Sequence, residues 1–405
     1  MMPIKFWIKV AFFNFTVAAL MGLTLRANFI WEIPWMDFRF LLHGHSHIAM
    51  LGWIYMALYA LIINAFVPEE KQNSRFYRRL YSFTQLSVIG MMIAFPIQGY
   101  AAISITFSTI NLILSYVFAF GLWKDIRGNQ QASYKVLRVS ILSLIISSIG
   151  LWAMAMVMAF KLNHTELYNL VIQFYLHFQF NAWFILAVIA LLIKYLSKKT
   201  TFQANQRTIN IFLISYSLAI LLTFFHVMFW AYKAEYMGIL NSLGVVLQMA
   251  SIVYLISKFS NKPIIQFISQ NKLNSKSLLV VGLFSILLKV LIQVLLVIPD
   301  VAAISTQLRH FMIAYIHLIN LGVITCIILY IFNQLFSFLK LGWETYLFLF
   351  GIVSTELFLF IQGLFYWQNW GEIPAYSYFM FILSIPLPLS IGLMFMNLFK
   401  KVNPS

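Results

Sequence analysis

Charged residues are scarce in this chain, and acidic ones most of all. Of its 405 residues only 9% are charged, with 11 Asp and Glu against 27 Lys and Arg. The polar stretches that carry these charges are short, which excludes a soluble domain of useful size. The one cysteine, Cys326, lies within an apolar stretch, so an intrachain disulfide and a metal site built from several cysteines are both excluded.

Apolar residues make up 62% of the chain, and the mean hydropathy is +0.87. Stretches of about 20 such residues recur from end to end, each long enough to cross a bilayer as a helix. The sequence therefore predicts an all-α fold, a single integral membrane domain over residues 1–405 with about twelve transmembrane helices. The predicted spans are 6–25, 41–66, 80–102, 104–123, 137–160, 168–193, 208–232, 237–257, 278–298, 308–335, 342–367 and 375–399.

The excess of basic residues indicates an orientation rather than a nucleic-acid partner. With the N-terminus in the cytoplasm, 21 of the 27 Lys and Arg residues fall in cytoplasmic segments. Such a bias follows the positive-inside rule and places both termini in the cytoplasm, as an even number of spans requires. Lys289 alone lies mid-span. The five basic residues on the opposite side are Arg26, Arg39, Lys161, Lys233 and Arg309.

Most of the eight histidines lie within apolar spans or at their edges, where ionisable groups are costly and usually mark pathways, partners or cofactors. Histidine is also the commonest protein ligand for haem and transition metals. In the predicted orientation, the histidines of spans 2, 6, 7 and 10 lie in the outer half of the membrane, which favours a shared cofactor layer. They are His43, His45, His47, His177, His226, His310 and His317.

Helical spacing separates the histidines within a span. His43 and His47 are four residues apart and share a face, whereas His45 points away, so one member of the pair suffices as a ligand. The other can bond a haem propionate or a carbonyl. His310 and His317 are seven residues apart, about 10 Å along the axis, which is too far for both to bind one iron.

Four charged residues near these spans are further candidates. Arg39 and Arg309 lie at the outer ends of spans 2 and 10, where they can neutralise haem propionates or simply reach the membrane interface. Lys289 and Glu356 lie deeper in their spans. They are candidates for proton transfer, for an ion pair with each other, or for structural polar contacts.

Four local sequences resemble segments of heme-copper oxidase subunit I. RFLLHGHSHIAMLG resembles its helix 2, with His43 as an axial ligand of a low-spin haem, and AYIHLINLG resembles helix 10, with His317 as the second ligand. QFYLHFQFNAWF resembles helix 6, with His177 as a copper ligand. FFHVMFWAYKAEYMGILNSLGVV resembles helix 7, with His226 where the family has a His-His pair. The layout is most similar to C-type oxidases and nitric oxide reductases, and the NnrS family is a related alternative.

Two positions depart from that family pattern. Helix 10 of the family has two histidines separated by one residue, and here the first is Tyr315, a residue type that can itself bind haem iron. Helix 7 supplies one histidine, His226, in place of two. The resemblance thus implies an intact low-spin haem site and an altered catalytic centre.

The resemblance implies a redox protein of the bacterial inner (plasma) membrane. It would hold a b-type haem between His43 (or His47) and His317, and copper at His177 and His226. Quinol or a cytochrome would supply electrons, partner subunits would be present, and oxygen or nitric oxide would react near Tyr315. Two other interpretations of the histidines stay open. One is a haem or copper carrier, sensor or assembly factor, and the other is a metal- or proton-coupled transporter without haem.

Overall fold

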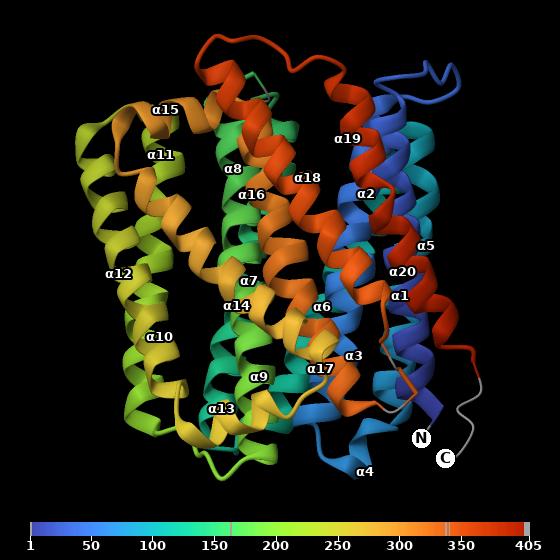
Figure 1. Ribbon diagram of the computed structural model, residues 1–405, viewed down its shortest axis with the longest axis vertical. Helices are drawn as coiled ribbons and strands as arrows, with labels where there is room; N and C mark the ends of the chain where they lie inside the picture. The colour runs from blue at the N-terminus through green and yellow to red at the C-terminus, as the bar shows by residue number, and fades with distance from the viewer. Residues whose placement is uncertain (1, 163, 337, 340, 401–405) are drawn as a thin grey trace. The chain divides into compact units, whose positions relative to one another are not determined.

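The computed structural model describes residues 2–162, 164–336, 338–339 and 341–400, and these residues form helices and no strand (Figure 1). Twelve helical segments among them are long and apolar enough to cross a membrane, which confirms the predicted fold class and span number. Seven spans are single helices, namely α1 (Met2–Ala27), α5 (Arg75–Gln98), α6 (Ala102–Ile126), α7 (Ala132–Ala159), α12 (Glu235–Phe259), α14 (Leu273–Leu295) and α18 (Glu344–Trp367).

The other five spans are built from shorter helices in series. Three of them contain a π-helical segment, namely α2 (Phe38–His47), η1 (Ile48–Tyr55) and α3 (Met56–Phe66); α8 (Glu166–Phe178), η2 (Gln179–Phe184) and α9 (Ile185–Lys199); and α16 (Arg309–His317), η3 (Leu318–Thr325) and α17 (Cys326–Leu335). The remaining two are α10 (Gln206–Thr223) with α11 (Phe225–Tyr232), and α19 (Tyr376–Ser384) with α20 (Pro386–Asn397). Short helices between spans are α4 (Glu69–Gln72), α13 (Lys262–Ser269) and α15 (Pro299–Gln307).

Three details differ from the predicted spans. The turn between spans 3 and 4 lies at residues 99–101 rather than at 103, because Gly99 adopts φ +60, which favours glycine. Span 12 is broken before Pro386, which lacks the N–H that a continuous helix needs. Span 7 is broken at Phe224, next to a close approach of α12, where a Cβ on Gly244 would lie 2.8 Å from the Thr223 nitrogen.

The contacts within the chain divide it into two compact units, and the single membrane domain over residues 1–405 stays a prediction. Unit 1 comprises Met1–Asp125, Lys272–Leu279 and Thr325–Ser405, and unit 2 comprises Ile126–Asn271 and Val280–Ile324. The boundaries fall inside α14 and at the end of η3, so spans 9 and 10 each contribute to both units. Hydropathy cannot show such a division, because it reports whether a segment crosses the membrane and not which segments pack together.

In unit 1, α1 packs against η1, α2, α3 and α20 (Figure 1). Amide groups join three of its spans, since Asn14 and Gln85 donate to each other at 2.8 and 3.0 Å and Asn14 also donates to the Gly52 carbonyl at 2.8 Å. The Trp53 ring stacks on Phe15 with centroids 4.2 Å apart. Polar pairs and aromatic stacking together fix the position of span 2 within the unit.

In unit 2, α7 packs against α8, η2 and α9, and α10 packs against α12. The contact between α7 and α8 requires a residue without a side chain, because a Cβ on Gly150 would lie 2.6 Å from the Val171 carbonyl oxygen. Farther along the same pair of spans, the Ser140 hydroxyl donates to the Trp183 carbonyl at 2.9 Å. These contacts hold span 6, which carries His177, against span 5.

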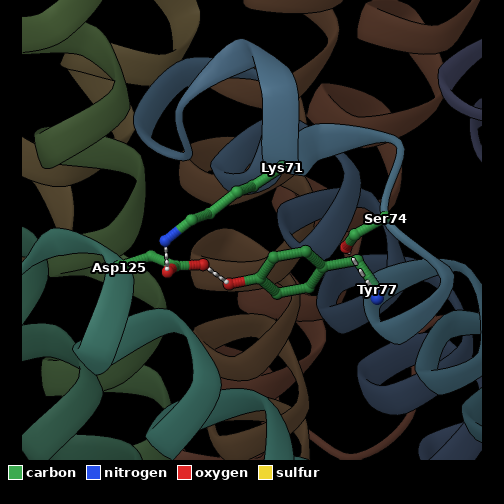
Figure 2. A network of polar contacts seen from close by, with 4 residues as sticks. All are labelled: Lys71, Ser74, Tyr77 and Asp125. Atoms are coloured by element: carbon green, nitrogen blue, oxygen red, sulfur yellow. Dashed lines mark hydrogen bonds and ion pairs between the residues drawn. The ribbon is translucent and has the colours of Figure 1, made fainter.

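A polar network joins the start of α5 to the end of α6 in unit 1 (Figure 2). The Lys71 ammonium and the Tyr77 hydroxyl both donate to the Asp125 carboxylate, each at 2.7 Å. The hydrogen bond from Lys71 to this carboxylate raises the pKa of Lys71. The network closes the turn between spans 2 and 3 against the end of span 4.

Candidate functional site

Each of the three spans with a π-helical segment carries a candidate histidine just before that segment. His47 and His317 directly precede η1 and η3, and His177 lies two residues before η2. The same spans are the most enclosed ones, with 78, 83 and 61% of their most apolar windows buried against 28–50% for the other nine. Since π-helical turns are rare and frequently occur at functional sites, these positions are the first place to look for a site.

The π-helical segments also contain buried polar atoms that have no hydrogen-bond partner among the described residues. They are the Tyr55 hydroxyl in η1, the Asn181 Oδ1 and Trp183 Nε1 in η2, and the Asn320 Oδ1 in η3. An unsatisfied buried polar atom costs free energy, so most such atoms in proteins are paired with protein, water or a ligand. Of these atoms, the amide oxygens of Asn181 and Asn320 lie nearest in sequence to a candidate histidine, four residues after His177 and three after His317.

In unit 1, His43 and His47 both face the turn between α5 and α6. The His47 ring stacks on Phe95 with centroids 4.1 Å apart, and the His43 ring meets Tyr100 edge to face at 4.6 Å. The Tyr100 hydroxyl lies 3.4 Å from Nε2 of His47. The structure therefore brings the two histidines to one face. It adds Tyr100, which sequence reasoning missed because this contact links separate spans.

Backbone carbonyls determine which nitrogen of two imidazoles carries the proton. Nδ1 of His47 lies 2.9 Å from the His43 carbonyl oxygen, and Nε2 of His177 lies 2.9 Å from the Ile220 carbonyl oxygen. A carbonyl only accepts, so these nitrogens donate and the opposite nitrogens keep the lone pair when the ring is neutral. This arrangement is usual for histidines that bind a metal or haem iron. It leaves Nδ1 of His177 open, whereas Nε2 of His47 already lies 3.4 Å from the Tyr100 hydroxyl.

His45 has a different role. Its Nδ1 donates to the Ala18 carbonyl at 2.8 Å, and a Cβ added to Gly22 would lie 2.9 Å from its ring. The side chain therefore packs into α1, on a different face of span 2 from His43 and His47, as helical spacing predicts. This histidine is a structural contact between the first two spans.

In unit 2, basic side chains from three spans lie near one another. His226 on α11 and Lys289 on α14 both act electrostatically on His177 of α8, whose ring lies 5.5 Å from the Phe224 ring. All acidic residues of the unit lie elsewhere, in the first turns of α8, α12 and α15. They are Glu166, Glu235 and Asp300. The mid-span basic groups therefore have no acidic residue of their own unit beside them.

Lys289 is the most unusual of these groups. Its side chain is 1% exposed, and Gln293, one turn farther along α14, is 7% exposed. Neither the Lys289 ammonium nor the Gln293 Oε1 has a hydrogen-bond partner among the described residues. A buried charge without a partner is strongly unfavourable, so Lys289 must be neutral or contact an anionic group from outside its own unit.

The candidates of span 10 all lie on α16. Arg309 is exposed at the first position of this helix, whereas His310, Tyr315 and His317 are partly buried. Tyr315 interacts electrostatically with Tyr216 of α10, which places it within unit 2. It thus belongs to the same unit as His177 and His226, the two histidines with which the sequence groups it.

The charged candidates of unit 1 fall into two places. Arg39 is exposed near the start of α2, and its charge acts on His43. Glu356 of α18 forms an electrostatic cluster with Arg26 at the end of α1 and Tyr376 at the start of α19. The sequence places Arg26 only among the basic residues on the side opposite the cytoplasm, because nothing local to it indicates an acid on a span more than three hundred residues away.

The predicted haem ligands come from different units, His43 from unit 1 and His317 from unit 2, so their pairing stays a prediction. No group of three or more His, Cys, Asp or Glu side chains suited to a metal ion occurs among the described residues. The predicted copper site has two histidines, and its third candidate ligand is a tyrosine. No known protein-family profile matches the chain, and no curated protein matches it significantly.

Proposed function

We propose that this chain is a haem-binding redox protein of a bacterial inner membrane, similar to heme-copper oxidase subunit I. The observation that carries the proposal is the repeated placement of a histidine just before a π-helical segment in spans 2, 6 and 10. These spans are also the most enclosed. One histidine in such a place is explained by an interhelical hydrogen bond, but three in the same relation to a rare backbone feature favour ligand binding.

His43 is the proposed iron ligand from unit 1, with His317 as the ligand from unit 2. His47 is engaged at both ring nitrogens, by the His43 carbonyl and the Tyr100 hydroxyl. The His43 ring, by contrast, contacts the rings of Phe95 and Tyr100. The nitrogens of His43 are therefore the ones left for iron, and His47 positions the segment that carries it.

A b-type haem held by two imidazoles supplies electron transfer without an open position for oxygen. The charge of Arg39 already acts on His43, so this guanidinium is the proposed partner of a haem propionate. Arg309 and His310, at the start of α16, are the proposed partners on the side of His317.

The second proposed site lies in unit 2, where His177, His226 and Tyr315 would hold copper. His177 offers Nδ1, because its Nε2 donates to the Ile220 carbonyl, and imidazole suits copper better than it suits magnesium or calcium. Oxygen or nitric oxide is the proposed substrate, quinol or a cytochrome the electron donor, and Lys289 and Glu356 the proton-transfer residues. Both termini would lie in the cytoplasm, and partner subunits would complete the assembly.

Absorption spectroscopy of the purified protein tests the haem. We expect Soret and α bands of six-coordinate haem in the wild type and their loss or conversion in His43→Ala and in His317→Ala, because either change removes an axial ligand. His45→Ala, which removes a structural contact with α1, and His164→Ala, in an exposed loop, should keep the wild-type spectrum. If only His47→Ala lost the bands, the axial ligand would be His47, one turn along the helix from His43.

Metal analysis on the same samples separates the alternatives. Haem together with copper supports the two-site protein, and copper should fall in His177→Ala and His226→Ala while the haem bands persist. Haem without copper or turnover would favour a haem carrier, sensor or assembly factor. A protein that binds zinc or copper but no haem would contradict the proposal and favour a metal-coupled transporter.

A further inference from the structure

A pocket of about 480 Å³ lies in unit 2, where α10 begins and α12 ends. Its lining includes Arg207, Thr208 and Ile211 from the first turns of α10, and Tyr254 and Lys258 from the last turns of α12. None of its lining residues is acidic. The pocket thus combines two cations with hydroxyl donors at one end of two spans that pack against each other.

The two cations of the pocket are available to a ligand. Both Arg207 and Lys258 are exposed, and the Lys258 ammonium lies 5.5 Å from the ring centre of Tyr254. The acid closest in sequence, Glu235, is the first residue of α12 and lies at the opposite end of that helix from Lys258. No carboxylate of unit 2 therefore neutralises this pocket within the part of the chain that the structure describes.

An apolar surface continues from the pocket along both helices. The exposed residues follow a spacing of three and four, which places them in one stripe along each helix. All of them are 37–71% exposed, and they are Ile211, Ile214 and Leu218 on α10 and Val253, Met249 and Val246 on α12. A ligand with an anionic head and long apolar chains would match the pocket and the stripes together.

We propose that this pocket binds the phosphate headgroup of an anionic phospholipid, with the acyl chains along the stripes of α10 and α12. Arg207 offers a planar fork that suits phosphate oxygens, Lys258 adds a second positive charge, and the hydroxyls of Thr208 and Tyr254 can donate hydrogen bonds. The pocket lies on the side predicted to be cytoplasmic, where basic pockets between helices bind anionic headgroups. The proposal stands independently of haem binding.

Native mass spectrometry of the purified protein with equal amounts of phosphatidylglycerol and phosphatidylcholine tests this site. We expect the wild type to retain phosphatidylglycerol with a preference of roughly tenfold, and the double variant R207Q/K258Q to lose that preference. The matched control is K198Q/K199Q, which removes two exposed positive charges from the same unit outside the pocket and should behave as the wild type. R207K, which keeps the charge but not the fork, should be intermediate.

Several outcomes would overturn the proposal. They are an equal affinity of the wild type for the two lipids, an equal loss of preference in K198Q/K199Q, and displacement of the lipid by millimolar inorganic phosphate, which would show a site for the free anion. Thermal unfolding confirms that each variant is folded, and R207K reports on the site even if the double variant is not. The preference should persist in His43→Ala, so failure of the haem proposal leaves this result interpretable.

Discussion

The two units differ in how their amides and charged groups are paired. In unit 1, Asn14 pairs with Gln85, Lys71 with Asp125, and Glu356 shares a cluster with Arg26. In unit 2, the polar atoms without a hydrogen-bond partner include a lysine, a glutamine, two asparagines and a tryptophan. They belong to Lys289, Gln293, Asn181, Asn320 and Trp183.

This contrast indicates where a bound group would contribute most to the protein. The buried amides of unit 1 have partners within the unit, and its atoms without a hydrogen-bond partner include the hydroxyls of Tyr55 and Thr345. In unit 2 a buried amine and several amide atoms lack such a partner and leave free energy that a ligand can recover. Basic groups without an acid beside them, as at His177 and Lys289, specifically favour an anionic or metal-bound partner. Removing a paired charge from unit 1 should therefore lower the free energy of unfolding, whereas removing a buried charge without a hydrogen-bond partner from unit 2 should raise it.

The largest change in the free energy of unfolding is expected in unit 1. Arg26→Gln removes the cation that acts on Glu356, whose carboxylate oxygens are both buried, and we expect a loss of about 2 kcal/mol in the free energy of unfolding. Thermal unfolding in detergent measures it. Arg26→Lys keeps the charge and should lose less, and the double variant with Glu356→Gln should recover part of the loss. A neutral effect of Arg26→Gln would show that the cluster does not stabilise unit 1.

In unit 2 we expect the loss of a charge to raise the free energy of unfolding. Lys289→Met replaces a buried amine without a hydrogen-bond partner by an apolar chain of similar length, and we expect a gain of about 1 kcal/mol in metal-free protein. Lys262→Met, at an exposed position of the same unit, should change stability little. Thermal unfolding again decides. A clear loss in Lys289→Met would mean that Lys289 has an anionic partner that stays bound through purification.

How far the sequence predicts this molecule depends on whether a feature is local. Twelve spans follow from hydropathy, and the shared face of His43 and His47 follows from their four-residue spacing, because both depend on neighbouring residues only. The π-helical segments carry no such signal, since they differ from α-helix only in hydrogen bonds that span five residues instead of four, within equally apolar sequence. The contacts of Tyr100 and Arg26 are with residues of other spans, so one sequence does not predict them. The division into two units depends on how the spans pack, which one sequence does not predict either.

The smallest expected effect on stability concerns Lys71, which, in contrast to Lys289, forms an ion pair with an acidic residue. Hydrogen bonding to Asp125 raises the pKa of Lys71 above its ordinary 10.5, so folding favours the charged form. The contribution of the charged Lys71 to the free energy of unfolding is therefore fully present below pH 10.5 and is lost as the pH rises through the raised pKa of the folded state. The Lys71 side chain is 51% exposed, so solvent limits the effect.

In thermal unfolding between about pH 9 and 12, wild type should be more stable than Lys71→Met at the lower pH and converge with it at the higher. Lys198→Met removes an exposed lysine without such a bond and should run parallel to wild type. A constant difference between wild type and Lys71→Met would assign the effect to packing of the lysine chain instead of its charge.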